Sequence, residues 1–451
     1  MKPYEYIMNS AVLFRRFAAG QHEQTRFTRY LESIEYMSRD ELMALQAENM
    51  SALLRHTVGN VPYYREFSGK LELSPKTVND DIKEFPVLTR EIILENYDDL
   101  IDPGTRGGKR YKTGGTTGKK ATTIRDRSEF LHSADEYFNR MTGIYPGKSR
   151  LWIRRDESVY LAEKQNDRVS SSNFISRTNI VSPAYMDKER LEYLYRVYRR
   201  NRPRLILGIT EPIYRFAEYI RKNKLKVYPV DLVGTGGQTM LPRYRKLIGG
   251  VFEGAKILDG YGATEFGRLA NQCSRAGGYH YIPLIHYVET VDDDYRDIPA
   301  GQTGQFLVTN LFKRKMPLIR YRIDDLVTMS DKVCECGRGF PLIESFEGRR
   351  IESIVSPKHT YMTPLPFFEI MDGYRDVDDF IVEQKDASTV RLLLKMKEGT
   401  FRKVHQLAVR KEINRYLDYP MKLEVDYTDE IKPLPNGKIM RVRGLESIAG
   451  K

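Results

Sequence analysis

The chain has few cysteines for its length: three among 451 residues. So few thiols exclude a disulfide scaffold and favour a reducing compartment, so we expect a cytoplasmic protein. Long hydrophobic runs are also missing. The mean hydropathy is −0.52, and no apolar run is long enough to span a bilayer, so stable membrane insertion is not expected. The apolar residues 11–14 are followed by Arg15 and Arg16, which argues against a signal peptide.

Acidic residues are the minority charge: 61 Asp and Glu stand against 73 Lys and Arg, giving a net charge of +12. The basic residues are scattered among nearly as many acids. No RNP, zinc-finger or basic-zipper pattern occurs, so we do not expect a nucleic-acid partner. A positive surface also suits polyanionic small molecules such as ATP, pyrophosphate and coenzyme A.

The length predicts roughly two or three domains. The N-terminal region, about residues 1–60, is expected to be helical, with a capping box from Ser38 to Glu41. In the middle of the chain, apolar segments of strand length alternate with helical patterns, which predicts an α/β fold with parallel strands. The expected elements there are a helix over 128–141, strands over 205–209 and 227–233, a helix over 241–252 and a strand over 256–258.

After residue 284 the pattern becomes rich in strands, which predicts a β-subdomain over 284–311. The last hundred residues are expected to form a small α+β unit after a boundary near residue 348. Its expected elements are a helix over 366–371, strands over 380–382 and 390–396, a helix over 401–416 and a strand over 423–425.

One segment combines glycines with hydroxyl side chains: Thr113, Gly114, Gly115, Thr116, Thr117 and Gly118. Glycines let backbone N–H groups approach phosphate oxygens, and threonine hydroxyls add donors. The Walker pattern is absent, and a flexible glycine loop is the alternative interpretation.

Two glycine-containing motifs follow expected strands. Gly236, Gly237 and Gln238 could line an adenine. Further on, Tyr261, Gly262, Ala263, Thr264 and Glu265 combine a ring that can stack on a base with a carboxylate that can hold Mg²⁺. Ligands of α/β sheets bind at the carboxyl ends of strands, which is where both motifs are expected. Each motif alone is also compatible with an ordinary strand-to-helix turn.

Two charged residues complete the ordered set. Asp325, in the sequence Arg-Tyr-Arg-Ile-Asp-Asp-Leu, can accept both hydroxyls of a ribose, or can form a surface salt bridge with neighbouring arginines. Lys438 follows Pro-Leu-Pro-Asn-Gly near the C-terminus.

Taken in order, these motifs resemble the adenylate-forming superfamily of acyl-CoA synthetases, peptide-synthetase adenylation domains and luciferases. The resemblance is closer to the phenylacetate–coenzyme A ligase branch with its capsule-biosynthesis (CapK-like) relatives. Residues 61–65 (VPYYR) and 85–90 (FPVLTR) look like N-terminal signatures of that branch. The similarity runs from about residue 45 to the C-terminus.

The resemblance implies a large AMP-binding domain over 1–347, a hinge over 348–352 and a small mobile domain over 353–451. It also implies roles: residues 113–118 bind phosphate, Tyr261 to Glu265 bind adenine and Mg²⁺, Asp325 binds ribose, and Arg349 faces phosphate. Lys438, with Thr264 and Glu265, would be catalytic. The implied reaction uses ATP and Mg²⁺ to convert a carboxylic acid to an acyl-adenylate. The acyl group then passes to a thiol, for which the resemblance implies coenzyme A.

Two positions depart from the family pattern. The usual Tyr-Arg-Thr-Gly-Asp is Tyr321, Arg322, Ile323, Asp324 and Asp325 here, so Asp324 replaces a glycine. The hinge position, usually Asp or Lys, corresponds to Ile351 or Glu352. Both departures bear on domain rotation and therefore on the thioester-forming step.

The cysteines form a second constellation: Cys273, Cys334 and Cys336, with His280 soon after the first. Three thiolates and an imidazole suit a tetrahedral structural Zn²⁺ site. His286 is the rival for the fourth ligand, and three unrelated buried cysteines are the alternative.

Other functions remain open from sequence. The adenylate could pass to an amine or sugar in surface-polysaccharide assembly, or the chain could be a degenerate nucleotide-binding scaffold. The substrate acid is not named by the sequence, although residues 152–237 are expected to line its pocket. A homodimer is left open.

Overall fold

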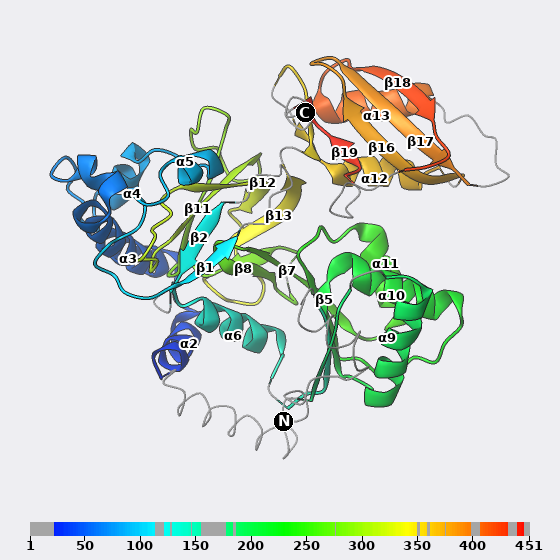
Figure 1. Cartoon of the computed structure of the whole chain (residues 1–451), viewed down its shortest axis with the longest axis horizontal. Helices are drawn as coiled ribbons and strands as arrows, with labels where there is room; N and C mark the ends of the chain where they lie inside the picture. Colours follow the sequence, from blue (N-terminus) through cyan, green and yellow to red (C-terminus); the bar gives the residue numbers. More distant parts are fainter. Residues whose placement is uncertain are drawn as a thin grey trace.

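The computed structural model describes residues 22–112, 121–126, 129–145, 147–154, 177–183, 186–275, 277–349, 352–358, 361–374, 376–397, 406–431 and 440–445. Its main feature is one sheet of eleven strands, and a separate sheet of four strands lies near the C-terminus (Figure 1). The α/β fold class expected from the sequence is confirmed. Among these residues, no helix combines the length and the apolarity needed to cross a membrane.

The N-terminal part is helical, as expected. Helix α2 (His22–Ile34) precedes helix α3 (Arg39–Asn60), and the two are joined by a tight turn. The capping box of α3 is present: Ser38 N donates to Glu41 Oε2 at 2.9 Å, and Glu41 N donates to Ser38 Oγ at 3.3 Å. Short helical turns follow: η1 (Pro62–Phe67), α4 (Val78–Asp81), η2 (Ile82–Glu84) and α5 (Arg90–Glu95).

Five neighbouring strands of the large sheet run parallel. In spatial order they are β4 (Thr178–Val181), β3 (Arg150–Ile153), β5 (Leu205–Ile209), β6 (Leu232–Gly236) and β7 (Lys256–Ala263). Helices α9 (Lys188–Asn201), α10 (Thr210–Lys222) and α11 (Pro242–Val251) pack against this part of the sheet, whereas α6 (Leu131–Thr142) packs against α2 and the next strand, β8 (Gly267–Gln272). A strand was predicted over 227–233, and the predicted start is wrong, because β6 begins only at Leu232. Pro229 has no N–H to donate to a neighbouring strand, which explains why residues before Leu232 do not pair.

The remaining strands of the large sheet are antiparallel, and this strand-rich part is larger than the 284–311 predicted from the sequence, because it begins before residue 284 and continues past residue 311. They are β8 (Gly267–Gln272), β9 (Tyr279–Tyr281), β10 (His286–Val291), β11 (Thr303–Asn310), β12 (Tyr321–Ser330) and β13 (Leu342–Arg349). A separate hairpin, β1 (Lys109–Lys112) and β2 (Thr122–Arg125), lies beside this half of the sheet (Figure 1).

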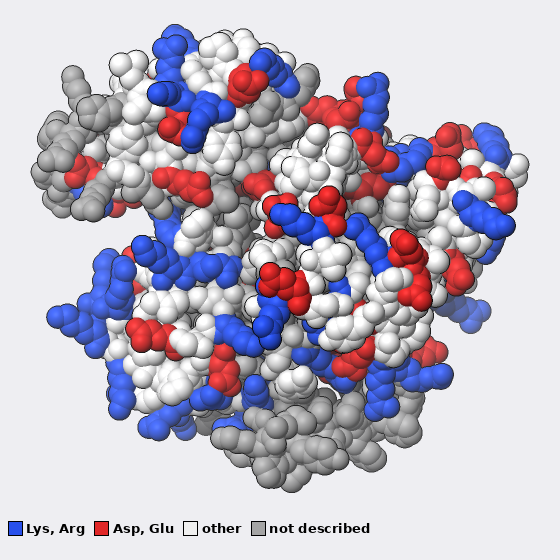
Figure 2. Space-filling view, turned by 180° about the vertical axis from the view of Figure 1, so that it is seen from behind, with Lys and Arg blue, Asp and Glu red and all other residues white. Residues whose placement is uncertain are grey.

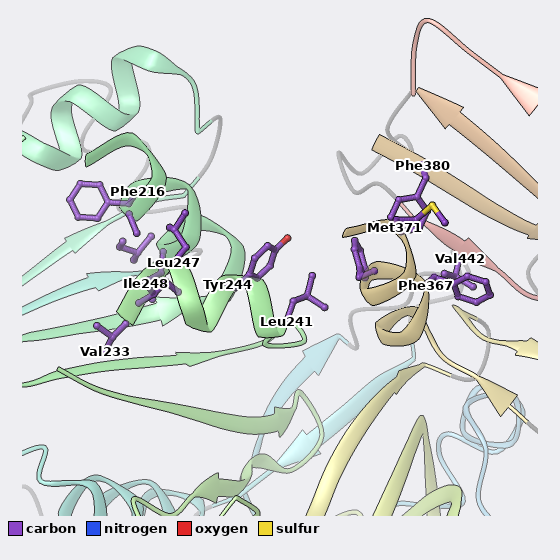
Figure 3. Packing of buried hydrophobic residues seen from close by; sticks show 14 of the residues in the cluster. Phe216, Val233, Leu241, Tyr244, Leu247, Ile248, Phe367, Met371, Phe380 and Val442 are labelled. Carbon is purple, nitrogen blue, oxygen red and sulfur yellow. The ribbon is translucent and has the colours of Figure 1, made fainter. Parts of the chain in front are cut away.

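The C-terminal unit has its own sheet in the order β18, β17, β16, β19. The elements expected there are present with adjusted bounds: α12 (Pro364–Asp372), β16 (Val377–Gln384), β17 (Thr389–Met396), α13 (Gln406–Leu417) and β18 (Lys422–Tyr427). The short strands β14 (Ile354–Val355), β15 (Tyr361–Met362) and β19 (Val442–Arg443) were not predicted from the sequence. Figure 3 shows Tyr244 of α11 and Leu241, the residue just before this helix, on the side that faces α12, which carries Phe367 and Met371. Arg243 lies over the ring of Phe368 at 4.9 Å, so the two parts are in contact.

The excess of basic residues is not spread evenly along the chain. Between residues 186 and 256, Lys and Arg clearly outnumber Asp and Glu. Figure 2 shows basic side chains gathered over this part of the surface, which carries α9 and α10. The excess of basic over acidic residues is therefore concentrated in the part of the chain that carries α9 and α10.

Candidate functional site

The carboxyl ends of the parallel strands bring the two glycine motifs together. Gly236 ends β6 and pairs directly with Gly260 in β7, so the residues that follow each strand meet at one edge of the sheet. A Cβ at Gly236 would lie 2.7 Å from the carbonyl oxygen of Gly260. Only glycine allows this close approach, which explains the residue type at a place where the backbones of two paired strands come together.

A cavity of about 360 Å³ opens beside this edge. Its floor includes Gly234, Gly236, Gly260 and Gly262, none of which has a side chain to fill the space. Apolar and polar side chains from five strands, from α6 and from the residues just after α6 and β3 complete the wall: Thr142, Ile144, Trp152, Arg154, Leu207, Ile209, Leu232, Leu258, Arg268 and Asn271. Part of this wall lies within residues 152–237, where the sequence placed the acid pocket, while β7, β8 and the C-terminal end of α6 supply the rest.

Tyr261 and Asp325 lie against each other although 64 positions separate them in sequence. The Tyr261 hydroxyl donates a short hydrogen bond to Asp325 Oδ2, and Arg349 Nε lies 3.9 Å from Asp325 Oδ1. Burial raises the pKa of the Asp325 carboxyl, and the Arg349 charge opposes that shift. The structure thus joins three residues that the sequence placed separately at a nucleotide site.

The ring of Tyr261 is also fixed by an aromatic neighbour. It stacks on Phe346 of β13 with centroids 3.7 Å apart and an interplanar angle of 9°. Sequence reasoning did not single out Phe346. The sequence of β13 does not predict this contact, because the residue that Phe346 meets depends on how the strands are paired across the sheet. One face of the Tyr261 ring is therefore covered by Phe346.

Glu265 is buried at the end of the same motif, with 5% of its surface exposed. The Tyr321 hydroxyl donates to Glu265 Oε1 at 3.0 Å and fixes the carboxylate. A fixed carboxylate supplies the hard oxygen ligand that Mg²⁺ prefers, so the residue fits the role expected for it. Thr264 precedes it in the turn between β7 and β8 and is partly exposed.

Asp324, which replaces the family glycine, adopts a positive φ of 69°. Asp is one of the few residues with a side chain that tolerate this left-handed conformation. Arg322 Nε donates to Asp324 Oδ1 at 2.9 Å, and Arg90 lies 3.9 Å from the other oxygen. Asp324 therefore replaces the family glycine and keeps a positive φ of the kind that glycine readily adopts.

Gln238 contacts protein where the sequence suggested a place near adenine. Its side-chain oxygen accepts from Glu211 N at 2.9 Å, and its carbonyl oxygen accepts from Thr210 Oγ1 at the same distance. Gln238 therefore caps the N-terminus of α10, which leaves Gly236 and Gly237 to line the strand edge.

Asp259 connects the strands next to the two glycine motifs, and the sequence analysis assigned it no role. It is buried and accepts from Thr235 Oγ1 at 2.6 Å and from the Tyr279 hydroxyl at 2.9 Å. Burial raises the pKa of its carboxyl, while these hydrogen bonds oppose the shift. The residue thus links β6, β7 and β9 beneath the motif.

The cysteines and one histidine come together as expected. The ligand atoms of Cys273, His280, Cys334 and Cys336 all lie within 4.8 Å of one another. Cys336 Sγ is 3.3 Å from His280 Nε2, and Nδ1 of the same ring is 2.8 Å from the Phe340 carbonyl oxygen. A carbonyl acceptor on one ring nitrogen leaves the other available as a metal ligand.

His286, the rival ligand, lies outside that cluster. Its Nε2 is 3.3 Å from Asn310 Nδ2, and burial lowers its pKa to about 3. Two other expected site elements, residues 113–118 and Lys438, lie outside the described residues.

No family model matches the chain, but individual relatives do. The phenylacetate–coenzyme A ligase of Escherichia coli (strain K12) is 33% identical over 316 residues, which cover 66% of this chain and 70% of that protein. Protein CapK of Staphylococcus aureus is 24% identical over 322 residues, covering 68% of each chain. Among solved structures, a 2-hydroxyisobutyryl-CoA ligase in the postadenylation state has a TM-score of 0.70, 16% identity and 92% coverage of both chains, which is a likeness of fold.

The curated relatives agree with the family that the motifs resemble, and the solved structure agrees with the fold. The identity to the Escherichia coli enzyme extends over more than two thirds of its length, so the similarity is not confined to a short motif. The chain belongs to the phenylacetate–coenzyme A ligase family of adenylate-forming enzymes, and its class is that of the AMP-forming CoA ligases.

Proposed function

We propose that the protein activates a carboxylic acid with ATP and transfers the acyl group to coenzyme A. The observation that carries the proposal is the meeting of Tyr261, Glu265 and Asp325 at the carboxyl edge of the parallel strands, in a chain of this family. An acid entering the cavity beside Gly262 would have its carboxylate next to that edge.

The first half-reaction is attack of a substrate carboxylate oxygen on the α-phosphorus of ATP. The bond to pyrophosphate breaks, and an acyl-adenylate forms. Asp325 accepts hydrogen bonds from the ribose, Arg349 faces the phosphates, and Lys438 bridges the carboxylate and α-phosphate oxygens as charge develops. In such a reaction positioning and charge neutralisation supply most of the catalysis.

Glu265, which accepts a hydrogen bond from Tyr321, would hold Mg²⁺. The metal ion, when bound, offsets the negative charge of the pyrophosphate that leaves. Thr264 and residues 113–118 supply hydroxyl and backbone donors to the phosphates.

In the second half-reaction the coenzyme A sulfur attacks the acyl carbon, and AMP leaves with the electron pair of the carbon–oxygen bond. We assign this step to rotation of a small domain over 353–451 against a large domain over 1–347, about a hinge over 348–352. Asp324 keeps the glycine-like backbone next to Asp325, which weighs against a degenerate scaffold.

We also propose a structural Zn²⁺ ion bound by Cys273, His280, Cys334 and Cys336. The support is the chemistry of the donor set and the 4.8 Å limit on the separation of its ligand atoms. Four protein ligands leave no position for a reacting water, so the metal would stabilise the fold and take no part in the chemistry.

The test is a pyrophosphate-release screen with ATP, Mg²⁺ and panels of aryl, fatty and amino acids, followed by nucleotide analysis. We expect AMP and pyrophosphate to form with at least one acid, and a coenzyme A thioester to form when the thiol is added. Formation of ADP and phosphate would overturn the proposal. An adenylate that reacts only with an amine or a sugar would instead support the polysaccharide-assembly alternative.

A further inference from the structure

The cavity beside the glycine motifs lies on the face of the parallel strands opposite to α9, α10 and α11. Successive side chains of a strand point to opposite faces of the sheet. Ile206 and Val233 pack into the cluster that contains buried residues of these three helices. Their neighbours Leu207 and Leu232 pack in a small cluster on the other face, and both line the cavity. The floor of the cavity is therefore apolar and suits the carbon skeleton of an acid.

Two arginines add positive charge to this apolar cavity. Arg154 follows β3 and Arg268 lies in β8, and both line the cavity. The described part of the cavity wall carries no Asp or Glu, so no carboxylate of that wall competes for these guanidinium groups from within the cavity. A cavity of this composition favours a ligand that is both partly apolar and anionic.

The two arginines differ in their surroundings. Arg268 Nε lies 3.3 Å from Asp135 Oδ1, and Arg268 Nη1 donates to Asn139 Oδ1 at 3.2 Å, so α6 holds this guanidinium and offsets its charge. Arg154 lies over the ring of Trp152, with Cζ 4.8 Å from the ring centroid. Stacking on an aromatic ring orients a guanidinium while its N–H donors point outward in its plane, which is the geometry that matches a carboxylate.

The arginines also lie at different distances from the proposed place of reaction. Arg268 pairs across the sheet with Gly262 of β7, beside the position proposed for the reacting carboxylate. Strand β3 is three positions away from β7 in the order of the sheet, which corresponds to about 14 Å between the two backbones. Arg154 is therefore placed to meet the end of the acid that does not react.

We propose that Arg154 is a specificity-determining residue that binds a second carboxylate at the far end of the acid, so that the preferred substrates are dicarboxylic acids. This role rests on the proposed function, in which the cavity takes the acid. The span between β7 and β3, shortened by the arginine side chain, leaves room for several carbon atoms or an aromatic ring between the two carboxylates. Leu207 and Leu232 would contact that skeleton. Arg154 touches no reacting atom in this arrangement.

The first test measures pyrophosphate release with pairs of acids that differ only in the second carboxylate, namely linear acids of increasing length and ring-containing acids. The wild type should prefer the diacid of the best pair by roughly 10- to 100-fold in kcat/KM, the range expected for hydrogen bonds to a charged group. Arg154→Met should lose this preference through a lower kcat/KM for the diacid, with the KM for ATP unchanged. A higher KM for ATP or coenzyme A, with the acid preference unchanged, would place a phosphate at Arg154 and overturn the proposal.

Arg202→Met is the matched control. Arg202 follows α9 and lies over the ring of Tyr228 at 4.9 Å, so this variant loses a stacked arginine that is not among the residues lining the cavity. Its Tm should change about as much as that of Arg154→Met, and its acid preference should stay that of the wild type. Arg154→Lys keeps the charge without the planar fork and should keep part of the preference. Loss of the preference in Arg202→Met as well would reject a specific role for Arg154.

Trp152 provides a second measurement that needs no reaction. It is the only tryptophan of the chain and lines the cavity, so its fluorescence reports binding of an acid without ATP. A diacid should give a saturable change, with about tenfold weaker binding in Arg154→Met. Binding of a diacid without pyrophosphate release would reject the proposed function and retain the role of Arg154.

The opposite result separates the two ideas in the other direction. Pyrophosphate release from monoacids, with no preference for any diacid of the panel, would retain the proposed function and reject the role of Arg154. A wild type that shows neither a saturable fluorescence change nor pyrophosphate release with any diacid would reject that role as well.

Discussion

At the scale of single residues, Tyr261 and Asp325 show how the site is organised before nucleotide binds. The Tyr261 hydroxyl donates to the carboxylate, and the ring is stacked on Phe346. The two rings hold the carboxylate in one direction, so a ribose bound in the proposed way would meet an acceptor that is already oriented. Preorganisation of this kind lowers the cost of binding.

Asp325→Asn should raise the KM for ATP by about tenfold, because a hydrogen bond to a charged acceptor is worth roughly 1.5–3 kcal/mol and the amide retains one acceptor oxygen. The measurement is pyrophosphate release as a function of ATP concentration. Tyr261→Phe is the matched control, since it removes the donor to Asp325 and keeps the stacked ring. An unchanged KM in Asp325→Asn would remove this residue from the nucleotide site.

Lys438→Ala should nearly abolish adenylation while leaving ATP binding largely intact, because the lysine acts on charge that develops in the transition state. The thioester-forming step, started from synthetic acyl-adenylate and coenzyme A, should lose much less. Both half-reactions are measured by product formation in single turnovers. Equal losses in the two would contradict the assignment of this lysine.

At the scale of elements, local signals predicted most helices and strands, and long-range pairing determined the rest. The capping box at Ser38 and the apolar run of β5 are encoded within a few residues, and both are found where expected. The late start of β6 follows from Pro229, a local signal that an apolar run obscured. The stacking of Phe346 on Tyr261 depends on how β13 and β7 are placed within the large sheet, which no local pattern contains.

Strand β12 offers a test of its unusual residue. Asp324 has a φ of 69°, which costs a residue with a side chain roughly 1–2 kcal/mol relative to glycine. Asp324→Gly removes that strain but also the contact with Arg322, so the two effects should nearly cancel. Asp324→Ala keeps the strain and loses the contact, and it should be about 1 kcal/mol less stable than Asp324→Gly.

Chemical denaturation of the two variants, followed by the same optical probe, measures this difference. Because both variants lose the contact with Arg322, the difference between their stabilities measures the cost of the positive φ. Equal stability of the glycine and alanine variants would show that the positive φ is not a constraint at this position.

At the scale of the whole molecule, the four possible metal ligands connect parts of the chain that are distant in sequence. Cys273 follows β8 and His280 lies in β9, while Cys334 and Cys336 lie between β12 and β13. The sequence indicated this group because its three cysteines fall in two short segments. It favoured His280 over the rival His286, and the pairing of β9 with β13 is what brings His280 to the cysteines.

The loop beyond Cys336 also reaches the N-terminal helices. Gly339 N donates to the Glu35 carbonyl oxygen at 2.9 Å, and Arg338 pairs with the Glu35 carboxylate. A Cβ at Gly339 would clash with the carbonyl oxygen of Met37, so only glycine fits there. The candidate metal site is therefore placed to connect the turn between α2 and α3 with the large sheet.

Removal of the metal should therefore weaken the fold before it alters the chemistry. Cys334→Ser should lower the Tm and the yield of soluble protein, with faster hydrogen exchange at the turn between α2 and α3, because structural zinc contributes directly to folding free energy. The KM for ATP of the folded fraction should stay close to that of the wild type. Val333→Ser, next to it in the chain and 84% exposed, is the control that should change none of these quantities. Metal analysis of the wild type decides the premise: about one zinc per chain is expected, and only traces, with three thiols that titrate freely in the native protein, would reject the site.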